Sequence, residues 1–285
     1  MSGVAPCYTA FGEGEKRPPL LLVGALGEWV WRTTVESLKK RYRIVQVELP
    51  GFEKGAPLPS TAALSIDSLG ELLDTIVHRE KLDRVLVVGW SFGVQAAIAF
   101  AKQTETNIAG MVIVCGVAGR PFDTTGARVG ALAVPPLTRA VPRAVDWLAA
   151  HASRVDLLRQ FLTGLKNPAL WAKRFGLIDP FTDEALFNGM MSGFLAVDPA
   201  VYNRYTKIMS EHDDTAVLAS FAFPVLVVAG EKDVLMPPER MRSLCENIKD
   251  CEYFEIIGGT HYLPVEYGDL LALKIDAFVK DRCRK

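Results

Sequence analysis

The sequence predicts an α/β protein built on a mostly parallel sheet, and three observations support this prediction. Short runs rich in Val, Leu and Ile recur along the chain and alternate with helical patterns. These runs are continuously apolar, which is typical of strands that helices cover on both faces of a sheet. A chain of 285 residues with 49% hydrophobic residues is also long enough to bury a large core by itself.

Six segments have the composition of buried strands, namely 20–23, 43–49, 84–89, 111–115, 224–229 and 252–257. Four segments between or after them have helical patterns, namely 65–79, 92–102, 239–247 and 270–280. The segment 92–102 is small and apolar on every side, so we expect this helix to be buried against the sheet.

The alternation of strands and helices stops between residues 119 and 219. This stretch has helical patterns with Pro and Gly breaks and no convincing strand, and it is too long for a simple crossover between two strands. We therefore expect a core made of residues 1–118 and 219–285. Residues 119–218 are expected to form a helical insertion that lies over one end of the sheet.

The balance of charges argues against a nucleic-acid partner. Lys and Arg number 32 and Asp and Glu number 33, which gives a net charge of −1, and the sequence has no basic stripe. The first ten residues lack a signal-peptide pattern, and the apolar stretch 108–119 is shorter than the roughly 18 residues that span a bilayer. These features predict a soluble, cytoplasmic protein without a membrane partner.

Five cysteines are scattered along the chain without metal-ligand spacing: Cys7, Cys115, Cys245, Cys251 and Cys283. We expect them to serve as small buried hydrophobes or surface thiols. The sequence therefore predicts no metal site, and it implies no organic cofactor.

The segment Gly89-Trp90-Ser91-Phe92-Gly93 follows a predicted strand directly and opens the buried helix. In this context Gly-x-Ser-x-Gly forms a nucleophile elbow, a sharp turn that strains the serine backbone and exposes its hydroxyl. The glycines allow close backbone packing, and the helix N-terminus places positive partial charge where an oxyanion would form. Ser91 is therefore the candidate nucleophile.

A serine hydroxyl needs a base near neutral pH, and His261 is the candidate for this role. It stands in Gly-Gly-Thr-His directly after the last predicted strand, where a loop would present it to Ser91. His78 lies in a polar stretch near a helix end, and we expect it to be solvated. His151 and His212 fall in the insertion and would at most contact the substrate.

The base needs an acidic residue that orients it, and Asp233 is the first candidate. It lies just beyond the fifth predicted strand, and the carboxyl ends of parallel strands share one edge of a sheet. We therefore expect Ser91, Asp233 and His261 to converge at this edge. Glu231, nearer the strand, and Asp123, several residues past the fourth strand, are weaker candidates.

The order Ser91, Asp233, His261, with the serine in Gly-Trp-Ser-Phe-Gly, resembles the α/β-hydrolase superfamily. Three further segments carry the resemblance: 20–27 is similar to the strand and oxyanion loop, 48–52 to the Asp-x-Pro-Gly turn, and 224–233 to the acid-bearing strand. The insertion occupies the position of the usual cap. The resemblance implies an α/β-hydrolase fold, a mostly parallel central sheet covered by helices on both faces, with a helical cap.

The resemblance also implies an enzyme that hydrolyses carboxylic esters, lactones or thioesters through an acyl-serine. Related members that act on haloalkanes or epoxides use a carboxylate as nucleophile, so Ser91 favours acyl transfer. The backbone N–H groups of Leu26 and Phe92 are the expected oxyanion hole. One departure lies beside it, because Gly24-Ala25 stands where the family commonly has His-Gly.

The expected substrate is a small-to-medium molecule with a hydrophobic acyl group. Trp29, Trp31 and Trp90 cluster around the proposed oxyanion loop and nucleophile, and we expect Trp29 and Trp90 to contact the substrate. The segment 129–150 is rich in Ala, Val, Leu and Pro, which favours an apolar underside of the cap.

Two other interpretations of the sequence stay open. C–C bond hydrolases, perhydrolases and hydroxynitrile lyases use the same three residue types, and the sequence does not separate them from ester hydrolases. The altered oxyanion loop also allows a hydrolase-fold binding or receptor protein without turnover. The oligomeric state does not follow from the sequence.

Overall fold

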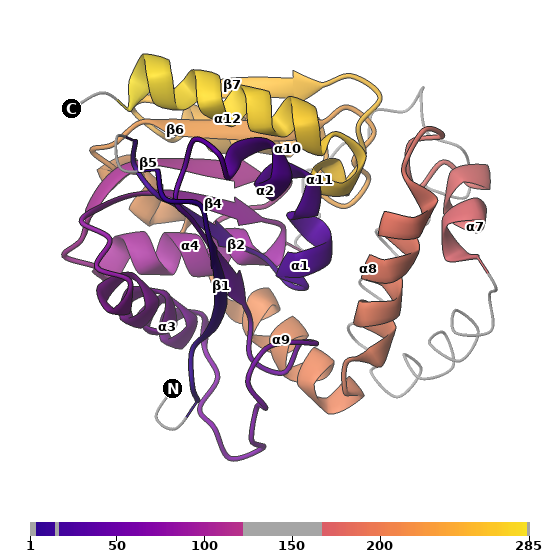
Figure 1. The fold of residues 1–285 in the computed structure, drawn as a ribbon, viewed down its shortest axis with the longest axis horizontal. Coiled ribbons are helices and arrows are strands. Elements are labelled where there is room, and N and C mark those ends of the chain that lie inside the picture. The colour runs from indigo at the N-terminus through magenta and orange to yellow at the C-terminus, as the bar shows by residue number, and fades with distance from the viewer. Residues whose placement is uncertain (1–3, 15–16, 122–166, 284–285) are drawn as a thin grey trace.

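The computed structural model describes residues 4–14, 17–121 and 167–283 (Figure 1). Seven strands form one sheet: β1 (Cys7–Phe11), β2 (Leu20–Val23), β3 (Ile44–Glu48), β4 (Arg84–Trp90), β5 (Asn107–Val114), β6 (Val225–Gly230) and β7 (Cys251–Ile256). Their order across the sheet is β1-β3-β2-β4-β5-β6-β7. β1 runs antiparallel to β3 and the other neighbouring pairs are parallel, which confirms a mostly parallel sheet.

All six expected strands are present, and β1 is an addition to them. Its sequence, Cys-Tyr-Thr-Ala-Phe, lies at the sheet edge with side chains that are only partly buried or exposed. An edge strand pairs on one side alone, so it needs no continuous apolar run. The pattern that identifies the six expected strands is therefore missing from β1.

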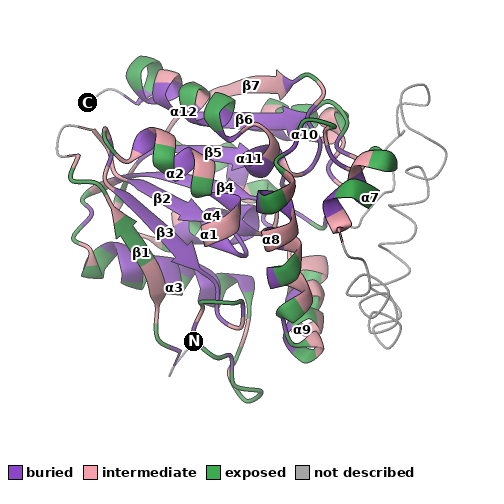
Figure 2. Cartoon of the chain, turned by 45° about the vertical axis from the view of Figure 1, so that its right-hand side comes forward, coloured by how far each residue is buried: buried purple, intermediate pink, exposed green. Residues whose placement is uncertain are grey.

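Helices cover both faces of the sheet (Figures 1 and 2). The core helices are α1 (Gly27–Val30), α2 (Arg32–Leu38), α3 (Ile66–Arg79), α4 (Phe92–Gln103), α10 (Pro238–Glu246), α11 (Leu263–Glu266) and α12 (Gly268–Arg282). α3 packs on α4, and α2 packs on α12. Most of α4 is buried, as its uniformly apolar sequence predicts.

Between β5 and β6 the described residues form α7 (Pro168–Arg174), α8 (Glu184–Ala196), α9 (Pro199–Glu211) and the 3-10 helix η3 (Thr215–Ser220). This part of the expected insertion is helical, and α8 contacts α1 of the core. The predicted apolar segment 129–150, together with Asp123 and His151, lies outside the described residues. Within the described ranges, no helix combines the length and the apolar character needed to cross a membrane.

The expectation for the cysteines is wrong at one pair, because Cys245 and Cys251 form a disulfide. The chain turns from the end of α10 into the start of β7 and brings the two Cα atoms to 5.6 Å, within the range that a disulfide bridges. The separation of six residues between the two cysteines does not reveal this turn, because it forms only when α10 packs beside β7. Cys7, Cys115 and Cys283 are free thiols.

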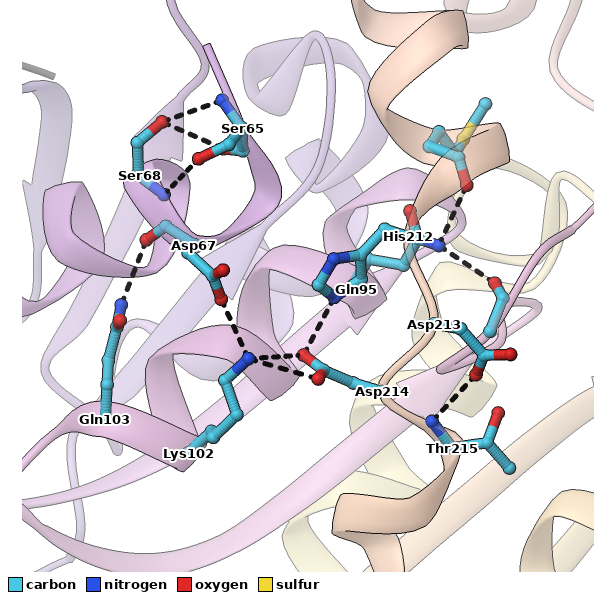
Figure 3. A network of polar contacts seen from close by, with 12 residues as sticks. Ser65, Asp67, Ser68, Gln95, Lys102, Gln103, His212, Asp213, Asp214 and Thr215 are labelled. Atoms are coloured by element: carbon cyan, nitrogen blue, oxygen red, sulfur yellow. Dashed lines mark hydrogen bonds and ion pairs between the residues drawn. The ribbon is translucent and has the colours of Figure 1, made fainter. Parts of the chain in front are cut away.

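A polar network joins the end of the insertion to the core (Figure 3). The Lys102 ammonium on α4 lies 2.8 Å from Asp67 of α3 and 3.0 Å from Asp214, which precedes η3. His212 Nε2 lies 2.8 Å from the same Asp214 carboxylate. Gln95 of α4 also donates to the Gly119 carbonyl, at the point where the chain enters the insertion.

Replacing Lys102 by Met is expected to lower the free energy of unfolding at pH 7 by about 1 kcal/mol, because the buried Asp214 loses a cationic partner. Partial burial lowers the pKa of Lys102, but the bonds to Asp67 and Asp214 outweigh it and raise this pKa above 10.5. The stabilisation is therefore complete at neutral pH and is lost as the pH rises through the folded-state pKa.

Urea unfolding of the wild type and the Lys102→Met variant at pH 7 measures this loss, and 1 M NaCl should reduce it. Lys207→Met is the matched control, because Lys207 is an exposed lysine on α9. Equal midpoints for Lys102→Met and the wild type would show that the network does not stabilise the fold.

Candidate active site

The three residues expected to converge are joined by hydrogen bonds at the carboxyl edge of the sheet. Ser91 follows β4, Asp233 follows β6, and His261 follows β7. His261 Nε2 lies 2.8 Å from Ser91 Oγ, and His261 Nδ1 lies 2.9 Å from Asp233 Oδ2. An ionised carboxylate only accepts, so Nδ1 carries the proton toward Asp233 and Nε2 is left to accept from the Ser91 hydroxyl.

Ser91 sits in a backbone conformation that few residues other than glycine adopt, with φ 51° and ψ −119°. The turn is fixed on one side by the Ser91 N–H, which donates to the Val114 carbonyl at 3.0 Å. Gly93 must lack a Cβ, because a Cβ there would overlap the Val23 carbonyl. The strand, the turn and the helix together therefore present the hydroxyl as a nucleophile elbow requires.

Asp233 is held by two backbone donors besides His261. The N–H groups of Leu235 and Met236 both donate to Asp233 Oδ1 at 2.8 Å, which leaves Oδ2 for the imidazole. Asp233 is 3% exposed and His261 is 7% exposed, so this pair is shielded from water. Glu231, the weaker acidic candidate, instead accepts from the Gly258 N–H at 2.8 Å.

The expected oxyanion donors both stand at helix N-termini. Leu26 is the N-cap residue of α1 in a left-handed conformation, φ 58° and ψ 51°, and Phe92 is the first residue of α4. The first N–H groups of a helix have no partner inside it, and they carry positive partial charge. This geometry suits both groups to bind an anionic oxygen.

Glu48 holds in place the loop of Leu26, the expected oxyanion donor, and the sequence did not reveal this role. Its carboxylate accepts from the N–H groups of Gly27 at 3.1 Å and Glu28 at 3.0 Å, and from the Gln46 side chain at 3.1 Å. Burial raises the pKa of Glu48, while these donors oppose the increase. The carboxylate thereby fixes the start of α1, and with it the backbone of Leu26.

The two tryptophans expected to contact substrate have different surroundings. Trp90 is 2% exposed and its indole N–H donates to the His261 carbonyl at 2.8 Å, so the ring has little free surface. Trp29 is partly buried against α8, where Gly189 leaves room for its ring, and its indole N–H donates to Glu53 at 2.9 Å.

Cys115 is a buried neighbour of the catalytic candidates that the sequence did not single out. Its Sγ, an Asp233 oxygen and a His261 nitrogen lie within 4.8 Å of one another, a set of ligand types that metal ions use. Burial raises the pKa of Cys115 well above its usual value and keeps the thiol protonated. A protonated thiol beside an Asp–His hydrogen bond suits a hydrogen-bonded cluster better than a metal centre.

A mostly parallel sheet with helices on both faces, and a Ser-His-Asp constellation on a nucleophile elbow, define the α/β-hydrolase class of enzymes. The model of the alpha/beta hydrolase fold family matches residues 18–266 of the chain. The chain belongs to this family, which confirms the resemblance and the expected hydrolase-type enzyme.

Among curated proteins, a pimeloyl-[acyl-carrier protein] methyl ester esterase from Nitrosomonas europaea is 28% identical over 75% of this chain and 75% of its own length. An enzyme of the same name from Nitrosospira multiformis is 24% identical over 98% of this chain and 100% of its own length. Among solved structures, an esterase from Exiguobacterium antarcticum superposes with a TM-score of 0.79, with 16% identity over 99% of this chain and 97% of that chain. The structural likeness shows the fold.

Proposed function

We propose that the protein hydrolyses carboxylic esters through an acyl enzyme formed on Ser91. The observation that carries this proposal is the continuous pair of hydrogen bonds, 2.8 Å from Ser91 Oγ to His261 Nε2 and 2.9 Å from His261 Nδ1 to Asp233 Oδ2. The strained turn at Ser91 supports it, and so do curated relatives named as esterases.

In the acylation step, neutral His261 accepts the hydroxyl proton as Ser91 Oγ attacks the ester carbonyl carbon. The carbonyl oxygen becomes an oxyanion, which the N–H groups of Leu26 and Phe92 bind. Asp233 stabilises the imidazolium that forms and holds its orientation. The tetrahedral intermediate then expels the alcohol, which leaves with the proton from His261 Nε2.

Deacylation repeats these steps with water in place of Ser91. His261 accepts a proton from the attacking water, and the same two N–H groups bind the second oxyanion. Collapse of this intermediate breaks the bond to Ser91 Oγ, which takes the proton from His261, and the carboxylic acid leaves. Each bond that forms in the two steps is matched by a bond that breaks, and the enzyme returns to its starting state.

We further propose that residues 119–218 form a cap over this site and that the acyl group is small to medium in size and hydrophobic. Aromatic side chains of the described insertion helices support this proposal. Phe187 of α8 packs edge-on against Tyr262, the neighbour of His261, at 5.3 Å between ring centroids. Tyr205 of α9 packs edge-on against Phe92 at 5.1 Å. Aromatic side chains packed against the neighbours of Ser91 and His261 favour apolar acyl chains.

The test is a series of p-nitrophenyl and methyl esters with acyl chains of two to twelve carbons, with matched thioesters and lactones, assayed for kcat/KM. We expect a maximum of at least tenfold over the extremes of the series, because each buried methylene adds about 0.8 kcal/mol until the cavity is full. Activity that is flat across chain length, or confined to charged substrates, would contradict the proposed substrate class.

Two further measurements separate the remaining interpretations of the site. Hydrolysis of vinylogous 1,5-diketones without ester turnover would indicate a C–C bond hydrolase. Ligands that raise the melting temperature without any turnover would indicate a binding protein.

A further inference from the structure

Glu266 lies outside the Ser91–His261–Asp233 constellation, yet its carboxylate contacts the loop that carries the base. It stands at the end of α11, and it accepts three hydrogen bonds. Oε2 accepts from the Thr260 N–H at 2.8 Å, and Oε1 accepts from the Thr260 hydroxyl at 2.7 Å. Oε1 also accepts from the Asp179 N–H at 2.9 Å.

The first two bonds fix the residue that immediately precedes the base. Thr260 is 3% exposed, and both its backbone and its side-chain donor end on the Glu266 carboxylate. On the C-terminal side of His261, the Trp90 indole N–H donates to the His261 carbonyl at 2.8 Å. The backbone at His261 is therefore held from two directions, by Glu266 and by the residue next to Ser91.

The third bond reaches the insertion. Asp179 lies between α7 and α8, and its N–H donates to Glu266 while its own carboxylate accepts from the Tyr267 hydroxyl at 2.9 Å. These two bonds join the insertion to consecutive residues of the core, at the junction of α11 and α12. One carboxylate thus binds the loop of the base and the insertion at the same time.

We propose that Glu266 is a positioning residue that, through Thr260, keeps His261 Nε2 within hydrogen-bonding distance of Ser91, and that seats the insertion at Asp179 by the same carboxylate. This inference rests on the proposed function, because it assigns Glu266 to the base of that reaction. Glu266 touches neither Ser91 nor the reacting atoms, so its effect is on the rate of the chemical step rather than on substrate binding.

Glu266→Gln is the informative variant, because an amide has one acceptor oxygen where the carboxylate has two. With its oxygen at the Oε1 position, the amide NH2 faces the Thr260 N–H. In the flipped orientation, it faces the Asp179 N–H, and the Thr260 hydroxyl must accept from the amide instead of donating to a carboxylate. Either way a donor meets a donor, although the side chain keeps its size. We expect kcat to fall about 10- to 100-fold while KM changes less than threefold.

Glu231→Gln is the matched control, because Glu231 accepts from Gly258 in the same loop but is exposed. We expect its kcat to stay within threefold of the wild type. Thr260→Val removes the hydroxyl that donates to Glu266 and accepts from the Tyr262 N–H but keeps the Thr260 N–H bond, and we expect an intermediate loss of about threefold to tenfold. This variant keeps the proposal testable if Glu266→Gln fails to fold, as judged by circular dichroism.

The result that overturns the inference is a wild-type kcat in the folded Glu266→Gln or Thr260→Val variant. A rise in KM at unchanged kcat, or an equal loss of kcat in Glu231→Gln, would overturn it as well. Failure of the proposed function gives a different result, because the wild type itself would then neither hydrolyse esters nor react with a fluorophosphonate.

Discussion

Replacing Ser91 by Ala is expected to lower ester turnover at least a thousandfold, and His261→Ala should lower it to a similar extent. Ser91 supplies the oxygen that bonds to the substrate, and His261 Nε2, 2.8 Å away, supplies the acceptor for its proton. Because the two side chains act as one unit, removal of either should abolish nearly all of their joint contribution. The residual rate would come from the oxyanion donors alone.

Intact mass after incubation with a fluorophosphonate measures the reactivity of the serine directly. The wild type should gain one adduct, and Ser91→Ala should gain none. Ser220→Ala, which changes an exposed serine at the end of η3, is the control and should be labelled like the wild type. An adduct or undiminished turnover in the folded Ser91→Ala variant would disprove the role proposed for Ser91.

Asp233→Asn is expected to reduce kcat by about 100- to 10,000-fold, although the side chain keeps its shape. The N–H groups of Leu235 and Met236 both donate to Oδ1, so the carbonyl oxygen of an Asn must occupy that position. The amide NH2 then lies where Oδ2 accepts from His261 and donates to Nδ1 instead. This moves the ring proton to Nε2, which can no longer accept a proton from Ser91.

The measurement is single-turnover acylation of Asp233→Asn with a p-nitrophenyl ester, with Asp213→Asn as control. Asp213 is an exposed carboxylate that accepts from the Thr215 N–H rather than from His261, so its variant should acylate at the wild-type rate. An Asp233→Asn variant that acylates within tenfold of the wild type would mean that another group orients His261.

Much of the core follows from local sequence signals. Adjacent residues encode the strand β4, the turn at Ser91 and the helix α4. The strand has a continuous apolar run, the turn has two glycines, and the helix has a uniformly small apolar sequence. Such signals act over a few residues, so they are visible without knowledge of the packing. The helix α3 likewise begins at Ser65, whose side chain caps it.

The features missed by the sequence analysis depend on how the elements of the fold pack against one another. β1 is recognised by its partner β3 rather than by its own composition. The disulfide between Cys245 and Cys251 needs the turn between α10 and β7. Neither feature has a local pattern that distinguishes it from loop sequence or from free thiols.

The fold class and the three side chains that meet at one sheet edge can be predicted from the sequence alone, because parallel strands end at that edge and the chain shows which residues follow each strand. The groups that hold these side chains in place become visible in the folded structure. Glu48 binds the loop at Gly27, 21 residues before it, and Trp90 binds His261, 171 residues after it. Glu266 binds Thr260, six residues before it, and Asp179, 87 residues before it, so these hydrogen bonds form only when the elements of the fold pack together. A carboxylate or an indole has the same appearance in a sequence whether it is solvated or holds a catalytic loop, since its role depends on the donors and acceptors that folding brings to it.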